Sequence, residues 1–93
     1  MSEEIEFPID GTLDLHTFSP REVKDLAPEY LASCRDRGIL QVRIIHGKGI
    51  GTLREMAHSI LAKLPEVESF RLADEAGGGW GATIVILKPF YAA

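Results

Sequence analysis

The sequence has very little of several features that would assign a protein to a familiar class. Its single cysteine, Cys34, cannot form an intramolecular disulfide and has no second cysteine at a metal-ligand spacing. No apolar run approaches the ~20 residues that cross a bilayer, and the first four residues lack the basic-then-apolar order of a signal peptide. We therefore expect a cytoplasmic protein with no membrane partner, in which Cys34 is a small buried hydrophobe.

Basic residues are scarce for a protein that would bind nucleic acid broadly. The chain has 10 Lys and Arg against 14 Asp and Glu, a formal net charge of −4. Nonspecific affinity comes mainly from basic groups that release counterions from phosphates, so this composition argues against tight, broad binding. Three of the acids, Glu3, Glu4 and Glu6, lie near the N-terminus, and the rest of the chain is close to neutral. A local basic site on a near-neutral body is compatible with this balance.

Two common nucleotide-binding patterns are also absent. Neither the P-loop spacing nor the dinucleotide fingerprint occurs, although the chain has 9 glycines. The chain does have 45% hydrophobic residues within a length of 93, which is enough for one compact domain with one core. We expect an extended N-terminal arm at residues 1–11, the domain at residues 12–88 and a short tail at residues 89–93.

Helix boundary signals surround a first amphipathic stretch. Ser19, Pro20 and Glu22 supply a serine N-cap, a proline at the first helical position and a glutamate three residues after the cap. Pro28 has no amide proton, so it must kink or divide this helix. Gly38 is typical of a C-cap and ends the stretch.

A second amphipathic stretch begins at Thr52. Thr52 and Glu55 are spaced as a capping box, apolar residues recur at helical spacing after them, and Pro65 closes the helix. Short β-rich runs bounded by turn residues fill the remaining segments. They predict strands at residues 12–16, 41–46, 67–73 and 82–87.

The order of these segments is β-α-β-α-β-β, which predicts an α/β fold. We expect an α+β two-layer sandwich, with two helices on a mixed four-stranded sheet and right-handed crossovers in its parallel part. The apolar run 84–87 points to both faces of the sheet, so this strand should be covered on both sides or face a partner. The segment with Ile5, Phe7 and Ile9, or a second subunit in a homodimer, would supply the remaining cover.

Titratable side chains gather where two of the predicted strands end. His16 closes the first strand and His46 the second, so parallel neighbours would bring both imidazoles and Asp14 to one edge of the sheet. Histidine can exchange a proton near neutral pH, and a nearby aspartate can hold its tautomer. From spacing alone, Asp14 could equally cap a turn and His16 could be an ordinary strand-end residue. His58 flanks an apolar stripe, which favours a plain surface role.

A glycine-rich loop connects the second strand to the second helix. Gly47, Gly49 and Gly51 let the backbone approach an anion closely, and the amides of the helix N-terminus attract phosphate. Lys48 and Arg54 add positive charge beside them. The loop therefore indicates phosphate binding; the alternative is a strand-to-helix turn that simply needs glycine.

Trp80 is the only tryptophan and lies among glycines. A loop of glycines offers little for an indole ring to pack against. The ring could stack on a nucleic-acid base. The alternative is that it folds back over the sheet and seals the loop.

Four segments, in order, resemble the motifs of the Smr (small MutS-related) domain, and the similarity runs from about residue 12 to residue 88. The chain resembles the short, free-standing bacterial members of that family. The resemblance implies the two-layer α/β sandwich also seen in the C-terminal domain of bacterial translation initiation factor three. The segments are Leu13-Asp14-Leu15-His16, Arg43-Ile44-Ile45-His46-Gly47-Lys48-Gly49, Leu53-Arg54 and Gly79-Trp80-Gly81-Ala82-Thr83.

The resemblance also implies a function. Family members are described as endonucleases that nick DNA, some of them branched DNA, and as RNA-binding or RNA-cleaving proteins. By motif, Asp14 and His16 match the family's Asp-x-His pair, and residues 46–49 match its glycine loop. The expected partner is therefore DNA or RNA, in a process such as DNA repair or recombination. In the leading hypothesis His16 moves the proton, Asp14 orients His16, and His46 is a second acid or base.

Other interpretations stay open at this point. In a metal-assisted variant, Asp14 would bind magnesium or manganese, but the lack of a second well-placed carboxylate disfavours a two-metal site. The chain could instead be a non-catalytic module that binds nucleic acid through the same loop. A third alternative is a protein-interaction domain that uses the apolar sheet face.

Overall fold

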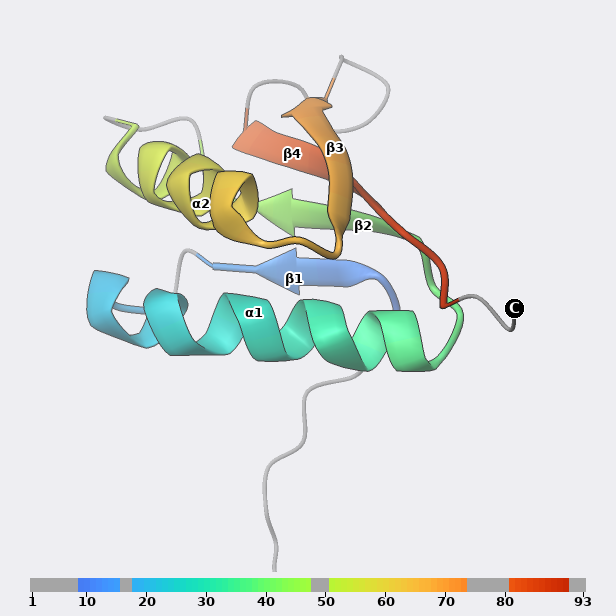
Figure 1. Cartoon of the computed structure of the whole chain (residues 1–93). Coiled ribbons are helices and arrows are strands. Elements are labelled where there is room, and N and C mark those ends of the chain that lie inside the picture. The colour runs from blue at the N-terminus through green and yellow to red at the C-terminus, as the bar shows by residue number, and fades with distance from the viewer. Residues whose placement is uncertain (1–8, 16–17, 48–50, 74–80, 91–93) are drawn as a thin grey trace, which may run out of the picture.

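The computed structural model of the protein describes residues 9–15, 18–47, 51–73 and 81–90. Within these residues the predicted β-α-β-α-β-β order is confirmed, with two helices on a mixed four-stranded sheet (Figure 1). The strand boundaries differ from the predicted ones by no more than two residues. The elements are β1 (Thr12–Asp14), α1 (Pro20–Asp36), β2 (Gln41–Ile45), α2 (Thr52–Lys63), β3 (Val67–Leu72) and β4 (Ala82–Leu87).

The strand order in the sheet is β1-β2-β4-β3. β1 pairs with β2 in parallel, with Leu13 opposite Ile44 and Asp14 opposite Ile45. β4 runs antiparallel to both β2 and β3, so β3 points in the same direction as β2. The strands β1 and β2 therefore end at one edge of the sheet, as predicted, and α2 begins at that same edge (Figure 1).

Helix α1 begins as the sequence predicts. The amide of Glu22 donates to the Ser19 hydroxyl at 3.3 Å, and the Ser19 amide donates to the Glu22 carboxylate at 2.8 Å, which completes a capping box. The helix runs through Pro28 without being divided, because its buried face packs against the sheet on both sides of the proline. Gly38 follows the C-cap residue Arg37 with a φ of +79°.

Helix α2 begins differently from the prediction, and the Thr52–Glu55 capping box is wrong. Thr52 is the first helical residue, and Gly51 is the N-cap with a φ of +89° and no side-chain cap. The amide of Glu55 donates to the Gly51 carbonyl at 2.9 Å, which is the first bond of the helix. The left-handed backbone at the N-cap requires glycine, so no hydroxyl is available there. The helix ends at Lys63, just before Pro65, as predicted.

Both helices are amphipathic. Their buried residues recur every three or four positions, as in Val23, Ala27 and Leu31 of α1 and in Ala57 and Leu61 of α2. These stripes pack against one face of the sheet and form the main core with Leu13, Leu15, Val42, Ile44, Val85 and Leu87. Within the described part of the chain, no helix is long and apolar enough to span a membrane.

Strand β4 is buried on both faces, as its apolar run predicts. Val85 and Leu87 point into the main core, whereas Ala82 and Ile84 belong to a second, smaller cluster on the opposite face. Of the N-terminal arm that was expected to add cover, Ile9 packs against the main core. Ile5 and Phe7 lie outside the described residues.

Cys34 is fully buried among apolar side chains of the main core. Burial raises the pKa of its thiol, which keeps it protonated at neutral pH. The neighbouring Tyr30 hydroxyl accepts from the Gly11 amide at 3.2 Å and donates to the Thr12 carbonyl at 3.0 Å, so it ties the start of β1 to α1. The prediction of Cys34 as a buried hydrophobe is confirmed.

Candidate functional site

The candidate site begins where β1 and β2 end. The amide of Leu15 donates to the Ile45 carbonyl at 2.8 Å, which continues the parallel pairing one residue past β1. His46 follows β2 and is level with Leu15. His16, the next residue of the predicted first strand, lies outside the described residues, as does Thr17. The edge therefore brings the end of the Asp14 strand beside the start of the glycine loop.

Asp14 and His46 share this edge but lie on opposite faces of the sheet. Asp14 is exposed and stands opposite Ile45, whereas Leu15, level with His46, is buried in the main core. Side chains alternate between faces along a strand. The Asp14 carboxylate thus points away from the helices, and the His46 imidazole points toward them. The sequence correctly placed both residues at the edge but did not reveal this difference of face.

His46 is held firmly by its neighbours and is only 5% exposed. Its Nε2 atom lies 2.8 Å from the Thr83 hydroxyl, and its Nδ1 atom lies 3.1 Å from the Gly47 carbonyl oxygen. The amides of His46 and Gly47 both donate to the Gly81 carbonyl, at 2.8 and 2.9 Å. Burial lowers the pKa of His46, the Gly47 carbonyl offsets part of that effect, and the Arg54 cation lowers the pKa further. The ring is therefore neutral at neutral pH.

His58 is part of the same site, and the prediction of a plain surface role for it is wrong. Its Nε2 atom lies 2.7 Å from the Thr83 hydroxyl, and its ring centroid lies 5.0 Å from that of Phe70. The His46 and His58 rings meet edge to face, with centroids 6.1 Å apart. Burial lowers the pKa of His58, and the nearby His46 and Arg54 lower it further. His58 is half-buried, and the flank of α2 that carries it faces Thr83 of β4 and Phe70 of β3.

Thr83 joins the two histidines, although no functional role was predicted for it from the sequence. It is completely buried, and in β4 it stands between Ile44 of β2 and Leu72 of β3. A buried hydroxyl requires hydrogen-bond partners, and the two imidazoles supply them. The signal in the sequence was one polar side chain within the apolar run of residues 82–87. This signal is weak because threonine is common in β-strands.

Positive charge stands at the N-terminus of α2. The Arg54 guanidinium lies over Gly51, where a Cβ atom would stand 3.0 Å from Nη2. The free amides of the first helical turn and the positive end of the helix dipole are located here as well. Of the predicted phosphate loop, the structure describes Gly47 and Gly51. Lys48, Gly49 and Trp80 lie outside the described residues.

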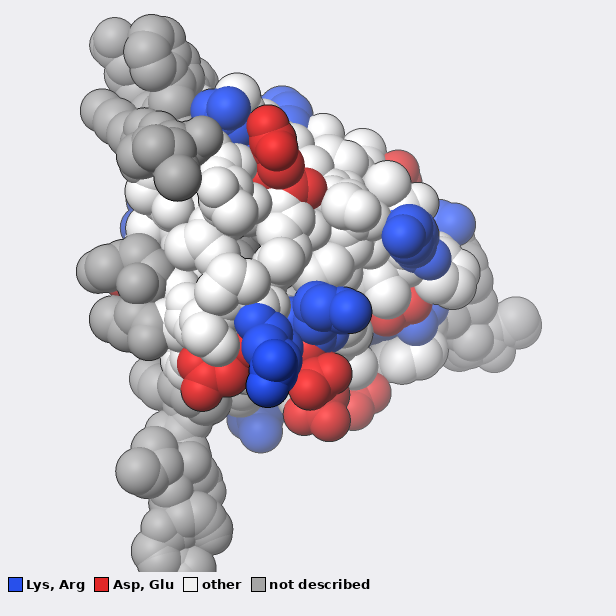
Figure 2. Space-filling view, turned by 90° about the vertical axis from the view of Figure 1, so that its left-hand side faces the viewer, with Lys and Arg blue, Asp and Glu red and all other residues white. Residues whose placement is uncertain are grey.

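The surrounding surface is mixed in charge. Viewed from the side where β1 and β2 end, Lys and Arg side chains are interspersed with Asp and Glu side chains and separated by uncharged residues (Figure 2). The described residues of this face therefore present no broad basic field, in keeping with the composition. Attraction for an anion here has to come from individual cations such as Arg54.

The described side chains do not provide a donor set for a divalent ion. Magnesium and manganese prefer carboxylate and other oxygen ligands. Within the described ranges, no group of three or more His, Cys, Asp or Glu side chains could hold a metal ion. Asp14 lies on the face opposite His46, and each histidine has its Nε2 atom engaged by Thr83.

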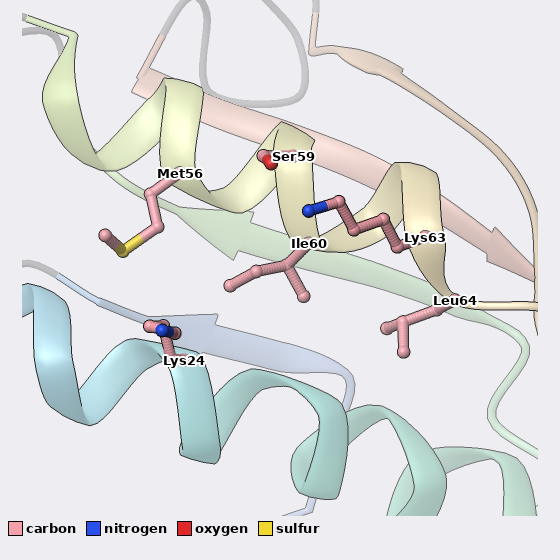
Figure 3. Close-up of a pocket in the computed structure, with 6 residues that line it drawn as sticks. All are labelled: Lys24, Met56, Ser59, Ile60, Lys63 and Leu64. Atoms are coloured by element: carbon pink, nitrogen blue, oxygen red, sulfur yellow. The ribbon is translucent and has the colours of Figure 1, made fainter.

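A groove between the two helices is separate from the histidine site (Figure 3). Its α2 residues recur at helical spacing on the side of that helix that faces α1, whereas His58 lies on the opposite side, against Phe70. The rim carries two lysines over a largely apolar lining. The lining residues are Lys24, Met56, Ser59, Ile60, Lys63 and Leu64.

Comparisons with known proteins agree with this architecture. Proteins named "Endonuclease MutS2" from Clostridium perfringens and Halothermothrix orenii are 39% and 40% identical to this chain over 80 residues. Those matches cover 86% of the chain but 10% of each relative, so the chain spans about a tenth of their length.

Solved structures are similar over most of the chain. The Smr domain of Thermus thermophilus MutS2 matches with a TM-score of 0.81 and 34% identity, over 86% of this chain and 100% of that one. YdaL, a stand-alone small MutS-related protein from Escherichia coli, matches with a TM-score of 0.80 and 25% identity, over 89% of this chain and 68% of that one. The family model described as "Smr domain" matches residues 13–88. The chain therefore belongs to the Smr domain family.

Proposed function

We propose that this protein binds the phosphodiester backbone of a nucleic acid at the N-terminus of α2 and cleaves it as an endonuclease. The observation that carries the proposal is the Arg54 guanidinium, which lies over Gly51 beside the first-turn amides of the helix. This combination of free amides, helix dipole and cation suits a phosphate group. The name "Endonuclease MutS2" of the relatives supports the choice of reaction.

Binding would combine two kinds of contact. Backbone amides of the glycine loop approach the phosphate without a side chain in the way, and Arg54 adds a charged contact. Lys48 and Gly49 continue this loop in the sequence and would add a second cation and a further amide. Because the surface is mixed in charge, we expect modest affinity that falls as salt rises.

Cleavage would be a hydrolysis driven by proton transfer. A water oxygen forms a bond to phosphorus while the bond from phosphorus to the leaving sugar oxygen breaks. His16 takes the proton of the attacking water and Asp14 orients His16. The leaving oxygen takes a proton from solvent, to which His16 then returns the proton that it accepted. His46 remains a candidate second acid or base, but its burial makes it better suited to holding the loop than to meeting the water.

A second candidate function is binding without cleavage. Two observations favour it: His46 has both ring nitrogens engaged, and Asp14 lies on the opposite face of the sheet. Such a module would use the same phosphate site to recognise the shape of DNA or RNA. It would bind every substrate that the endonuclease binds and release it intact.

A cleavage panel separates the two functions. The purified chain is incubated with single-stranded DNA, duplex DNA, branched DNA and structured RNA, each with magnesium, manganese or EDTA. The endonuclease proposal predicts nicking that is lost in His16→Ala and Lys48→Ala proteins and retained in Lys63→Ala, which removes a cation from the inter-helix groove. Nicking that persists in both the His16→Ala and the Lys48→Ala protein would overturn the assignment of the site. Binding of all substrates with no product establishes the second function.

A further inference from the structure

We propose that His58 is a positioning residue which acts through Thr83 to fix the tautomer of His46 and, with it, the first peptide of the glycine loop. The proposal deepens the proposed function, since it rests on that loop being the phosphate site. The tautomers of His46 and His58 that it predicts can be measured in the absence of nucleic acid. The hydrogen bonds that carry it all lie among described residues on α2, β4 and the end of β2.

The tautomer of His46 follows from its partners. Its Nδ1 atom lies 3.1 Å from the Gly47 carbonyl oxygen, and a carbonyl oxygen can only accept. Nδ1 therefore carries the proton. In a neutral ring the other nitrogen is then an acceptor, so Nε2 accepts the hydroxyl proton of Thr83 at 2.8 Å.

The tautomer of His58 follows in turn. The Thr83 hydroxyl has one proton, and that proton is committed to His46. The Thr83 oxygen must then accept from His58, whose Nε2 atom is 2.7 Å away and carries the ring proton. The hydrogen bonds therefore form a relay that runs in one direction, from His58 to Thr83, from Thr83 to His46, and from His46 to Gly47.

Both imidazoles must be neutral for this chain of bonds to hold. The surroundings favour neutral rings: burial lowers the pKa of both histidines, the positive charge of Arg54 lowers both further, and the two rings meet edge to face. On the other side, the His58 ring packs against the uncharged Phe70 of β3. Among the described residues, these rings contact Gly47, Thr83, Phe70 and each other, and none of these partners is a carboxylate that would favour the charged form.

The consequence for the loop is a fixed first peptide. Gly47 donates its amide to the Gly81 carbonyl at 2.9 Å and accepts at its own carbonyl from His46. Its φ of +84° sets the direction in which the chain leaves the sheet. Without the proton supplied by His58, the Thr83 hydroxyl could rotate to accept from His46. His46 could then hold its proton on Nε2 and lose its bond to Gly47.

The direct test is the protonation state of the ring nitrogens, measured by long-range 1H–15N NMR on the full chain at neutral pH. We expect a proton on Nδ1 of His46 and on Nε2 of His58. His58→Leu should shift His46 toward the Nε2 tautomer, whereas His58→Gln, whose amide can still donate to Thr83, should preserve the wild-type state. Thr83→Ser should preserve it as well, and Thr83→Val should abolish it.

A binding measurement links the relay to the loop. Fluorescence anisotropy with a short labelled DNA or RNA should show His58→Leu weakening affinity by about five- to tenfold, as expected for the loss of one hydrogen bond that holds the site. His58→Gln should restore most of it. Amide 1H–15N spectra check that each variant folds. If Thr83→Val does not fold, the Thr83→Ser and His58→Gln variants still decide the test.

The outcomes distinguish the two proposals. The relay is overturned if wild-type His46 carries its proton on Nε2, or if His58→Leu leaves the His46 tautomer and the binding affinity unchanged. Predicted tautomers in a protein that binds no nucleic acid would leave the relay standing and overturn the proposed function.

Discussion

The guanidinium group of Arg54 occupies the space that a side chain on Gly51 would need. A Cβ atom at residue 51 would stand 3.0 Å from Nη2 of Arg54, and the φ of Gly51 is +89°. Glycine at this position therefore does two things: it allows the left-handed turn into α2, and it lets a cation lie over the helix N-terminus.

Substitutions at Gly51 and at Gly38, taken together, separate these two roles of Gly51. Gly51→Ala should lower the free energy of unfolding by about 1–2 kcal/mol, because alanine is strained in the left-handed backbone conformation at residue 51. It should also weaken nucleic-acid binding, because Arg54 has to swing away from the helix N-terminus. Gly38→Ala is the matched control: its φ is +79° and a Cβ atom would meet nothing within 4 Å. It should show a similar loss of stability in urea denaturation with unchanged affinity. Equal affinity in the two variants would contradict the role of Arg54.

Removal of the Arg54 charge should alter the salt dependence of binding. If Arg54 contacts a phosphate, Arg54→Ala should reduce the slope of log Kd against log salt by about one. Lys63→Ala removes the same charge from the inter-helix groove and should leave the slope unchanged. Anisotropy titrations over a range of salt concentrations provide the measurement. Parallel slopes in wild type and Arg54→Ala would exclude a direct phosphate contact.

The lowered pKa values of His46 and His58 make stability depend on pH. The fold lowers the pKa of both His46 and His58, so between those lowered values and about 6.5 the unfolded chain binds protons that the folded chain excludes. The free energy of unfolding is therefore fully retained above pH ~6.5 and falls as the pH drops through the folded pKa values. Urea denaturation from pH 7.5 to 5 should show this loss.

A variant identifies the groups responsible. His58→Gln removes one titrating imidazole and keeps a donor for Thr83, so its stability should fall less steeply over the same pH range. His16 is present in both proteins and cancels in the comparison. Superimposable pH profiles would show that the loss of stability comes from other groups.

Arg35 attaches the end of the described chain to α1. Its Nε atom donates to the Lys88 carbonyl at 2.6 Å, and its guanidinium carbon lies 3.9 Å from the centre of the Phe90 ring. Arg35→Ala should lower the free energy of unfolding by about 1–2 kcal/mol through loss of a charged hydrogen bond and a cation–π contact. Arg37→Ala is the charge-matched control at an exposed position and should cost less than half as much. Urea denaturation measures the free energy of unfolding of both variants, and equal losses would contradict the role given to Arg35.

The parts of the fold that were predicted from sequence depend on local signals. The capping box of Ser19 and Glu22 involves residues three apart, so the sequence contains the whole interaction. At α2 the same pattern misled, because Gly51 directly precedes Thr52 and its left-handed backbone takes the N-cap position. The difference lies in a backbone angle that residue types alone do not specify.

The site was less accessible to sequence reasoning because its contacts are not local. Asp14 and His46 were placed at one edge by the rule for parallel strands, but their faces depend on a register that pairs Asp14 with Ile45. The bond between His58 and Thr83 joins residues 25 positions apart, from a helix flank to a strand. Helical periodicity shows that His58 flanks the apolar stripe, and only tertiary packing shows what lies against it.

The opposite directions of Asp14 and His46 divide the edge of the sheet into two compartments. Under the proposed function, the helix side, with His46, Arg54 and the α2 N-terminus, anchors the phosphate. The exposed side, with Asp14, meets whatever part of the ligand crosses the edge. A ligand that reaches both compartments has to bend over the strand ends, which a flexible or branched segment does more easily than a straight duplex. Affinity and turnover would then respond to substitutions on different faces of the same two strands.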